Sequence, residues 1–299
     1  MHHVLRADQI RPRPEYPGSS SGFARCSLVD RAAGSVHMAV RMCALAADGS
    51  VDEHVHSFEE SFFVLEGSPV LVLDGRAWRL LRGACGVVPV GVRHAWLGGG
   101  GDARWIDMCS PQPRVDGAGG QDTFFLGPPP RTEPAPLDVR DPLTRNFFRL
   151  DEGQMELDRL KVGAAVDEPT VSASMATALL AYSGIAVKML VDQRLDAQLH
   201  TMFMVEYEPG GVAHPHDHPL EESYVILEGE VEAHADGEQY TLRRGDAFWT
   251  GVGCVHAFYN RTDSRVRWLE TQAPQPPARH SYRFNRDWEY LESRIEQTP

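Results

Sequence analysis

The stretch from Gly210 to Gly229, GGVAHPHDHPLEESYVILEG, carries His216 and His218, two residues apart, and Glu222 four residues further on. Side chains two residues apart in a β-strand point to the same face, so we expect His216 and His218 to project together. Glu222 joins them from the next strand if the chain turns at residues 219–221. The spacing therefore predicts a cluster of three side chains of the kinds that bind metals.

A second stretch supplies a fourth side chain. Residues 245–260, GDAFWTGVGCVHAFYN, contain His256. Three imidazoles and one carboxylate form a borderline-to-hard donor set that suits Fe(II), Mn(II), Ni(II) or Zn(II). We therefore predict a divalent metal bound by His216, His218, Glu222 and His256.

The same pattern occurs twice in the chain. Adding 162 to each position from His54 to His94 carries that block onto residues 216–256 without a gap, and 16 of the 41 positions are identical. The identical positions include the ligand-type residues His54, His56, Glu60 and His94. The chain is therefore a tandem duplication, and a second metal site is predicted in the first copy.

The two copies differ in one outward-facing strand. Residues 230–235, EVEAHA, alternate between polar and apolar, as a strand with one solvated face should. The counterpart at 68–73, SPVLVL, has Val70 and Val72 in place of Glu232 and His234. That face is expected to be covered, either by the other domain or by a second subunit, which would make the protein a homodimer.

Composition limits the class of protein. A chain of 299 residues with 42% apolar and 24% charged residues fits two soluble globular domains. A formal charge of −13, without a basic run, argues against a nucleic-acid or anionic-membrane partner. Five cysteines without a CxxC pair, no apolar segment at the N-terminus and no long apolar run favour a cytoplasmic protein.

Short apolar runs separated by glycine turns fill both copies and indicate an all-β sandwich or barrel. Asp74-Gly75 and Asp236-Gly237 are strong hairpin signals. Short helices are expected at 151–162 and 286–295. The predicted organisation is an N-terminal arm (1–22), a barrel (23–110), a Pro/Gly-rich connector (111–170), a second barrel (171–275) and a tail (276–299).

These residues resemble the two motifs of the cupin superfamily. The second copy matches at Gly210, His216, His218, Glu222 and Gly229, and then at Gly245, Gly253, His256 and Asn260, with Gly251 where the family has proline. The first copy matches at His54, His56, Glu60 and Gly67, and then at Gly83, Pro89, Gly91 and His94. It departs from the pattern at Gly49, whose spacing to His54 is one residue short, and at Gly98, where the family has asparagine.

The resemblance covers about two thirds of the chain and implies a bicupin. Such a protein has two tandem jelly-roll barrels (double-stranded β-helices), each with a metal in its mouth. A rigid barrel holds the ligands in place and leaves coordination positions open, as a catalytic site needs.

Period-two alternation predicts the side chains around each metal. In the second copy Tyr224 could donate a proton, Ile226, Phe258 and Asn260 would line the pocket, and His214 would lie nearby as a hydrogen-bond donor or at the rim. In the first copy the same argument gives Phe62 and Trp96, so the first cavity is expected to be drier. Because the motifs of the second copy are fuller and its pocket is more polar, we expect that copy to be the catalytic one.

Three functions fit the pattern. The first is a non-heme Fe(II) dioxygenase that acts on a small hydroxylated, aromatic or heteroaromatic molecule with O2, because bicupins that resemble this chain include many dioxygenases. The second is a non-redox metalloenzyme with Mn(II) or Zn(II), namely a hydrolase, isomerase or decarboxylase. The oxalate decarboxylases of that class need a lid glutamate, which the sequence does not assign. The third is a ligand-binding cupin without activity.

Overall fold

The computed structural model describes residues 1–114, 122–130, 132–138, 141–151, 155, 182–275 and 283–284. Within these residues the chain is all-β, as predicted, with one sheet of 12 strands and one of 10 strands. The helical elements of this part are short 3-10 turns: η1 (Ala7–Gln9), η2 (Arg31–Ala33), η3 (Pro142–Thr144) and η6 (Gln193–Leu195). Apart from residues 151 and 155, the two expected helices lie outside the described residues. No helix in this part of the chain is long and apolar enough to span a membrane.

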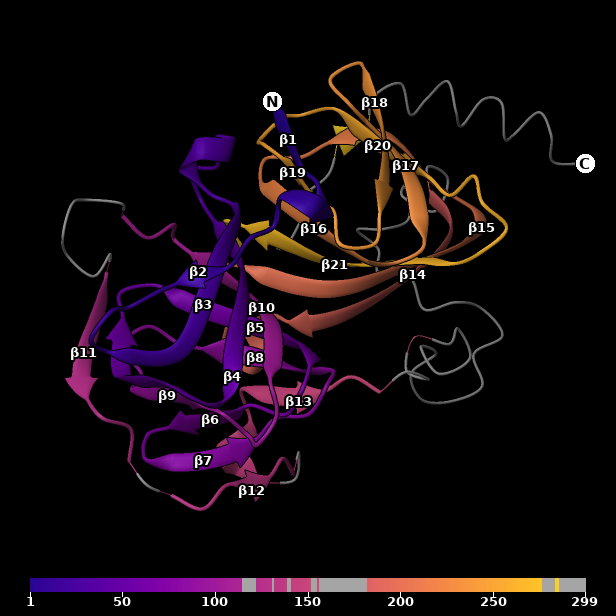
Figure 1. Cartoon of the computed structure of the whole chain (residues 1–299). Helices are drawn as coiled ribbons and strands as arrows, with labels where there is room; N and C mark the ends of the chain where they lie inside the picture. The colour runs from indigo at the N-terminus through magenta and orange to yellow at the C-terminus, as the bar shows by residue number, and fades with distance from the viewer. Residues whose placement is uncertain are drawn as a thin grey trace, which may run out of the picture. The chain divides into compact units, whose positions relative to one another are not determined.

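The 12-stranded sheet forms the N-terminal barrel. Its main path runs β12-β7-β6-β9-β4-β10-β5-β8-β13, and β2, β3 and β11 attach to it through β3 and β4 (Figure 1). The strands are β2 (Arg13–Pro14), β3 (Ser20–Val29), β4 (Ala39–His56), β5 (Glu59–Glu66), β6 (Val70–Leu73), β7 (Arg76–Arg79), β8 (Ala84–Val88), β9 (His94–Leu97), β10 (Ala103–Ser110), β11 (Thr123–Gly127), β12 (Ala135–Pro136) and β13 (Phe147–Arg149).

The 10-stranded sheet forms the C-terminal barrel. Its path runs β1-β19-β16-β21-β15-β20-β17-β18, and β14 and β22 pair with β15. The strands are β1 (His2–Leu5), β14 (Tyr182–Val191), β15 (Thr201–Asp217), β16 (Glu221–Glu228), β17 (Glu230–Ala235), β18 (Glu238–Arg243), β19 (Ala247–Thr250), β20 (His256–Tyr259), β21 (Val266–Ala273) and β22 (Arg283–Phe284).

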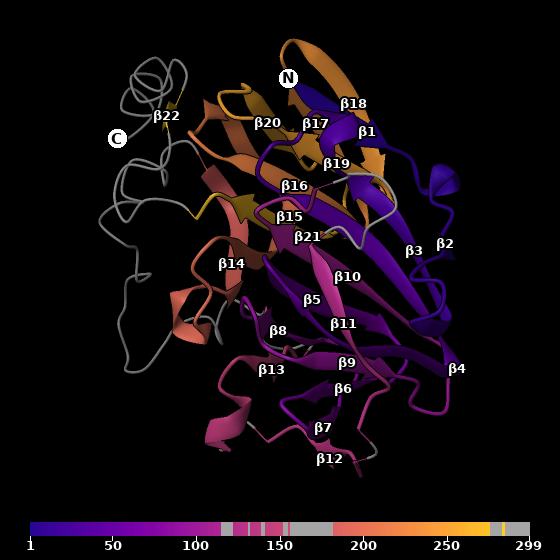
Figure 2. The same cartoon turned by 90° about the vertical axis from the view of Figure 1, so that its left-hand side faces the viewer.

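Each barrel includes a segment from the other half of the sequence. Residues 1–7 group with the C-terminal barrel, and residues 190–202 group with the N-terminal barrel. Figure 2 shows β1 beside β19, where His2 is opposite Thr250 and Leu5 is opposite Ala247. The first residues of the predicted N-terminal arm therefore extend the sheet of the C-terminal barrel.

The two predicted hairpins are confirmed. Asp74 and Gly75 join β6 to β7 with φ of 46° and 78°, and Asp236 and Gly237 join β17 to β18 with φ of 48° and 89°. Positive φ at both central residues is what a type I′ turn requires. The turn chemistry therefore sets the register of both hairpins.

Each barrel has its own aromatic core. Phe62, Trp96 and Trp105 are among the buried residues of the first core, and Tyr224, Phe258 and Trp268 are among those of the second. Val70 and Val72, whose face was predicted to be covered, are buried in a separate small cluster with Ala77 and Ala95. The cover that they require is therefore present within this one chain.

Two equivalent glycines test how closely the barrel backbones pack. Gly67 has φ of +77° and an added Cβ would lie 2.3 Å from the Asp102 carbonyl oxygen; for Gly229 the values are +76° and 2.5 Å, to the Arg265 oxygen. We expect alanine at either position to lower the free energy of unfolding by about 2–4 kcal/mol, because backbone strain and overlap add. Gly75→Ala is the control, since Gly75 has φ of +78° and open space, and it should cost about 1 kcal/mol. Equal losses in urea unfolding for all three variants would contradict this expectation.

Candidate metal centres

Three histidines converge in the N-terminal barrel. His54 and His56 share one face of β4, and His94 begins β9 opposite His54. Their rings lie 4.1–4.8 Å apart between centroids, and one nitrogen from each lies within 4.8 Å of the others. All three side chains are buried.

Hydrogen bonds at Nδ1 orient these imidazoles. Nδ1 of His54 lies 2.6 Å from the Asp52 carbonyl oxygen, and Nδ1 of His94 lies 3.0 Å from the Val92 oxygen. A carbonyl only accepts, so Nδ1 carries the proton and Nε2 keeps its lone pair. Nε2 of His94 is buried and forms no hydrogen bond among the described residues. An inward-facing lone pair of this kind fits a metal ion.

Burial also keeps these imidazoles in the neutral form that binds metals. It lowers the pKa of His54, and it lowers the pKa of His56 and His94 well below the ordinary value. Glu60 stands beside them on β5, with its Oε2 3.1 Å from Nε2 of His56. Nη2 of Arg41 donates to the same carboxylate oxygen at 3.3 Å. The predicted quartet is therefore assembled, with an arginine behind its carboxylate.

The C-terminal barrel repeats the arrangement. His216 lies on β15, His218 follows that strand directly, and His256 begins β20. The ring centroids of His216 and His256 are 4.3 Å apart, and those of His218 and His256 are 5.0 Å apart. Nδ1 of each ring donates to a main-chain oxygen, at His214 (2.7 Å), Leu220 (2.9 Å) and Cys254 (2.9 Å).

Glu222 is held more tightly than its counterpart Glu60. Its Oε2 lies 2.8 Å from Nε2 of His218 and 3.3 Å from Nε2 of His256. The Tyr224 hydroxyl donates to the same oxygen, and Nε2 of Gln272 donates to Oε1 at 2.5 Å. Burial acts to raise the pKa of Glu222, but the neighbouring histidines outweigh burial and hold that pKa well below the usual range. In return, the carboxylate outweighs the effect of burial on His218 and raises its pKa.

The other predicted site residues fall into different places. Trp96 lines a cavity. The Phe62 ring packs edge-on against the Trp96 ring, with 5.3 Å between the ring centroids. Ile226 and Phe258 belong to the packed core around Tyr224. These four side chains are therefore barrel interior, and Trp96 is the one among them that a described cavity reaches.

Asn260 binds main-chain carbonyl groups, and His214 supports the site through its own carbonyl group. Nδ2 of Asn260 donates to the carbonyl oxygens of Tyr207, Glu208 and Ser264 and thereby closes a loop. The carbonyl of His214 accepts from Nδ1 of His216, while its ring contacts Tyr259 at 6.1 Å. The backbone of His214 therefore supports the triad.

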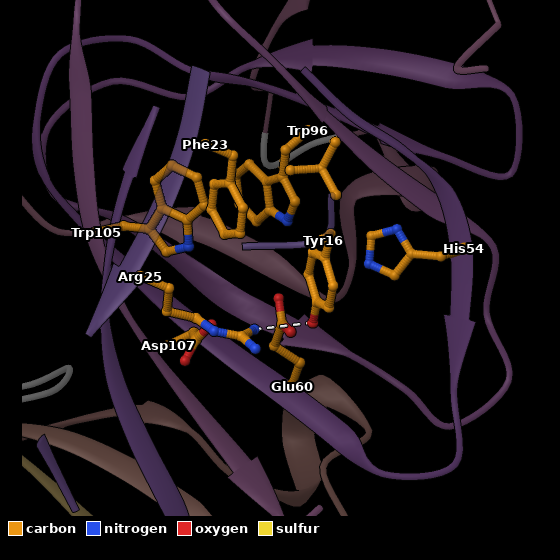
Figure 3. A pocket seen from close by; sticks show the side chains of 9 residues that line it. Tyr16, Phe23, Arg25, His54, Glu60, Trp96, Trp105 and Asp107 are labelled. Atoms are coloured by element: carbon orange, nitrogen blue, oxygen red, sulfur yellow. Dashed lines mark hydrogen bonds between the residues drawn. The ribbon is translucent and has the colours of Figure 1, made fainter. Parts of the chain in front are cut away.

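A cavity beside the N-terminal triad contains residues that sequence patterns did not single out. It is small and is lined by Tyr16, Phe23, Arg25, Val51, His54, Glu60, Trp96, Trp105 and Asp107 (Figure 3). Tyr16 lies in the turn between β2 and β3, and Arg25 lies on β3; both precede the motif region. One signal in the sequence could have pointed to this region. Arg25 and Arg41 are charged, whereas the second copy has Val187 and Phe203 at the equivalent positions, 162 residues later.

A Ser-His-Glu arrangement lies elsewhere in the N-terminal barrel. Nε2 of His200 is hydrogen-bonded to the Ser61 hydroxyl, and its Nδ1 lies 3.3 Å from Oε2 of Glu59. All three residues are at most 2% exposed, so no substrate reaches the serine. Glu59 also accepts from the amides of Gln198 and Leu199, so the group fastens residues 198–200 to β5.

A third group of ligand-type side chains lies in the C-terminal barrel. His2, Asp236 and Cys254 bring one ligand atom each within 4.8 Å, and Asp236 is paired with the α-amino group of Met1 at 2.5 Å. Cys254 contributes only its carbonyl oxygen to the His256 site. Its sulfur belongs to this separate group.

The Tyr224 hydroxyl is expected to position Glu222 for metal binding. Tyr224→Phe removes that hydrogen bond and gives the residue that the first copy has at Phe62. We expect the affinity of the C-terminal site for Mn(II) to fall about tenfold, the lower end of the usual effect of such partners. Competition with a chelator measures it, and Tyr259→Phe, on β20, is the control. An unchanged affinity would show that the hydroxyl does not position the carboxylate.

The stability of the metal-free protein should fall on acidification. His54, His56, His94 and His216 all have a pKa lowered mainly by burial. Below pH about 6.5 the unfolded chain therefore takes up protons that the folded chain does not. His218 opposes this effect through its raised pKa, and so do the buried carboxyl groups of Glu270 and Asp107, whose pKa burial raises.

Because the four histidines outnumber the opposing groups, we expect a net loss of stability between pH 7 and pH 5, measured by urea unfolding after chelation. His94→Leu should flatten the dependence, whereas His234→Ala should not. Stability that is constant over this range would contradict the assignment.

Comparison with known proteins agrees with the fold. Residues 41–109 and 203–271 each match the family model of the cupin domain. The structure superposes on oxalate decarboxylase from Lactobacillus farciminis, in a formate complex, with a TM-score of 0.62 and 15% identity, over 99% of this chain and 90% of that chain. A variant of oxalate decarboxylase from Bacillus subtilis gives a TM-score of 0.63 and 16% identity, over 98% and 83%.

One curated protein shares a shorter stretch. It is a β-D-galactosidase of Mycobacterium tuberculosis, 36% identical over 67 residues, which are 22% of this chain. The match spans 58% of the length of that relative. Two cupin matches on two barrels, each with its own histidine triad, show that the chain belongs to the cupin superfamily and is a bicupin.

Proposed function

We propose that the protein is a metal-dependent enzyme in which a divalent cation acts as a Lewis acid on a small, oxygen-rich molecule. One observation carries the proposal: in each barrel three buried imidazoles turn a nitrogen toward a common centre beside a carboxylate. His54, His56, Glu60 and His94 would hold one cation, and His216, His218, Glu222 and His256 the other. A bound cation would polarise a substrate oxygen.

The side chains around the two centres would exclude water and hold a proton. The packed aromatic rings of Phe62, Trp96 and Trp105 exclude water from one side of the first centre. In the second centre the Tyr224 hydroxyl donates its proton to Glu222, and the hydroxyl oxygen lies 3.1 Å from Nε2 of His256. Both features are fixed before a substrate binds, because they are part of the barrel core.

The comparisons support a reaction without net oxidation by O2 over a dioxygenase. The two structural neighbours are named as decarboxylases, and a study of the Bacillus subtilis enzyme names Mn(II) centres. The curated relative is named as a galactosidase. None of these names denotes an oxygenase, so we place Mn(II) ahead of Fe(II) in the proposal.

The test is the amount of O2 consumed per molecule of substrate converted. Chelated protein is reloaded with Mn(II), Zn(II), Ni(II) or Fe(II) and offered small carboxylates and hydroxylated compounds, with conversion followed by NMR and O2 by an electrode. We expect conversion with Mn(II) or Zn(II) and no net O2 uptake. The double variant His94→Ala, His256→Ala should lose this conversion, and His234→Ala should keep it. Uptake of about one O2 per substrate, with Fe(II) alone, would replace the proposal with a dioxygenase.

A further inference from the structure

We propose that His2, Asp236 and Cys254 form a third metal site, in the C-terminal barrel, which takes Zn(II) or another cation that accepts a thiolate ligand. The site is separate from the two histidine triads, and the inference does not depend on the proposed function. One nitrogen, one oxygen and one sulfur atom of these side chains lie within 4.8 Å of one another. Imidazole, carboxylate and thiolate are the side-chain ligands that zinc uses in proteins.

His2 presents an unbonded nitrogen to this group. Its Nε2 lies 2.8 Å from the hydroxyl oxygen of Tyr240, and that hydroxyl donates its own proton to Glu238. The hydroxyl oxygen therefore accepts from Nε2–H, so that Nδ1 of the neutral ring keeps its lone pair. Nδ1 is buried and forms no hydrogen bond with any described residue. A carboxylate-tyrosine-histidine chain of this kind orients an imidazole toward a metal ion.

The lone pair of His2 faces a carboxylate. Nδ1 lies 3.5 Å from Oδ2 of Asp236, and two electron-rich atoms at this distance repel each other unless a proton or a metal ion lies between them. Zinc bonds of about 2.0–2.3 Å place the ligand atoms of a tetrahedral site about 3.3–3.8 Å apart. A shared proton would involve these two atoms alone. The sulfur of Cys254, which lies within 4.8 Å of both, is the third ligand atom that favours a metal ion.

The charges and the exposure of the group suit a divalent cation. The carboxylate of Asp236 already holds a cation, because the α-amino group of Met1 lies 2.5 Å from its Oδ2. A zinc ion bound by this carboxylate and by the thiolate of Cys254 would form a neutral site, with the proton of the thiol released to solvent. The side chain of Asp236 is 38% exposed, which gives the ion a path from solvent, whereas Cys254 is buried.

Main-chain hydrogen bonds hold the segments that carry the three ligands. The amide of Gly251 donates to the carbonyl oxygen of Met1 at 2.9 Å, and the amide of Asp236 donates to that of Val255 at 2.9 Å. Asp236 is also the first central residue of the type I′ turn between β17 and β18, with φ of 48°. The ligands therefore need little rearrangement to bind an ion.

A metal ion at this site would fasten β1, the β17–β18 turn and the loop before β20 to one another. That loop orients a ligand of another site, because the carbonyl oxygen of Cys254 accepts from Nδ1 of His256 at 2.9 Å. The side chain of Cys254 would thus bind one ion, while its main chain orients a histidine toward a second one. The role of the third site is therefore structural.

The first barrel has different residues at the equivalent positions. Val92 stands 162 residues before Cys254, and Asp74 is the counterpart of Asp236. The side chain of Asp74 is 67% exposed and lies 4.0 Å from Arg93. These positions provide no thiol and no buried imidazole, so the ligand set belongs to the second barrel.

Titration with Co(II) tests the site, using the full chain after chelation and without an N-terminal tag. A thiolate ligand gives Co(II) a charge-transfer band in the near ultraviolet, which the histidine triads cannot produce. We expect this band to saturate at about one Co(II) per chain and to be lost in Cys254→Ser. His2→Ala and Asp236→Asn should each weaken Co(II) binding at least about tenfold. Asparagine suits the first position of a type I′ turn, so Asp236→Asn keeps the hairpin.

His3→Ala and Cys26→Ser are the controls, since His3 is the neighbour of His2 in β1 and Cys26 is a partly exposed thiol of the other barrel. Both should keep the band, and thermal unfolding of the same samples checks that each variant is folded. The double variant His94→Ala, His216→Ala should also keep it, so failure of the proposed function would leave the third site standing. No band in the unmodified chain, a band that survives Cys254→Ser, or unchanged Co(II) affinity in folded His2→Ala and Asp236→Asn would overturn the inference.

Discussion

Hydrogen bonds from imidazole Nδ1 to main-chain oxygens determine what both barrels can do. Five of the six converging histidines make such a bond, and the sixth, His56, bonds the Thr123 hydroxyl at 3.1 Å. In four cases the accepting carbonyl lies two residues before the histidine. The constraint is therefore local: the short segment that carries the histidine also fixes its tautomer and direction. The positions of the carboxylates and of any bound metal depend on imidazole nitrogens that already point inward.

The local nature of this constraint explains what could be predicted from sequence. Alternation along a strand placed His54 with His56, and the duplication transferred each inference to the other copy. The turn chemistry of Asp74-Gly75 was equally local. These features depend on residues close in sequence, and the structure confirms the all-β fold and the two triads.

The residues that were missed depend on contacts between distant segments. Tyr16 and Arg25 lie at least 29 positions before His54, in a region with no motif, and they reach the cavity because β3 pairs with β4. His200 is buried against β5, although 139 residues separate it from Ser61. No periodicity within one strand encodes such a pairing. A comparison of the two copies for unmatched charges would have pointed to Arg25 and Arg41.

The duplication also shows how the two centres have diverged. Both keep the same triad, but a tyrosine hydroxyl and an amide hold Glu222, whereas an arginine stands behind Glu60. The second centre is thus enclosed by neutral donors, and the first is joined to a charged cavity. The two copies therefore share one set of ligand-type residues but differ in the groups that hold the carboxylate.

The central claim is that each triad holds a divalent cation, and metal stoichiometry tests it most directly. Elemental analysis after reloading with Mn(II) should find about two ions per chain, about one in His94→Ala or in His256→Ala, and none in the double variant. A chain that holds no metal after reloading, or a double variant that still holds two, would contradict the account.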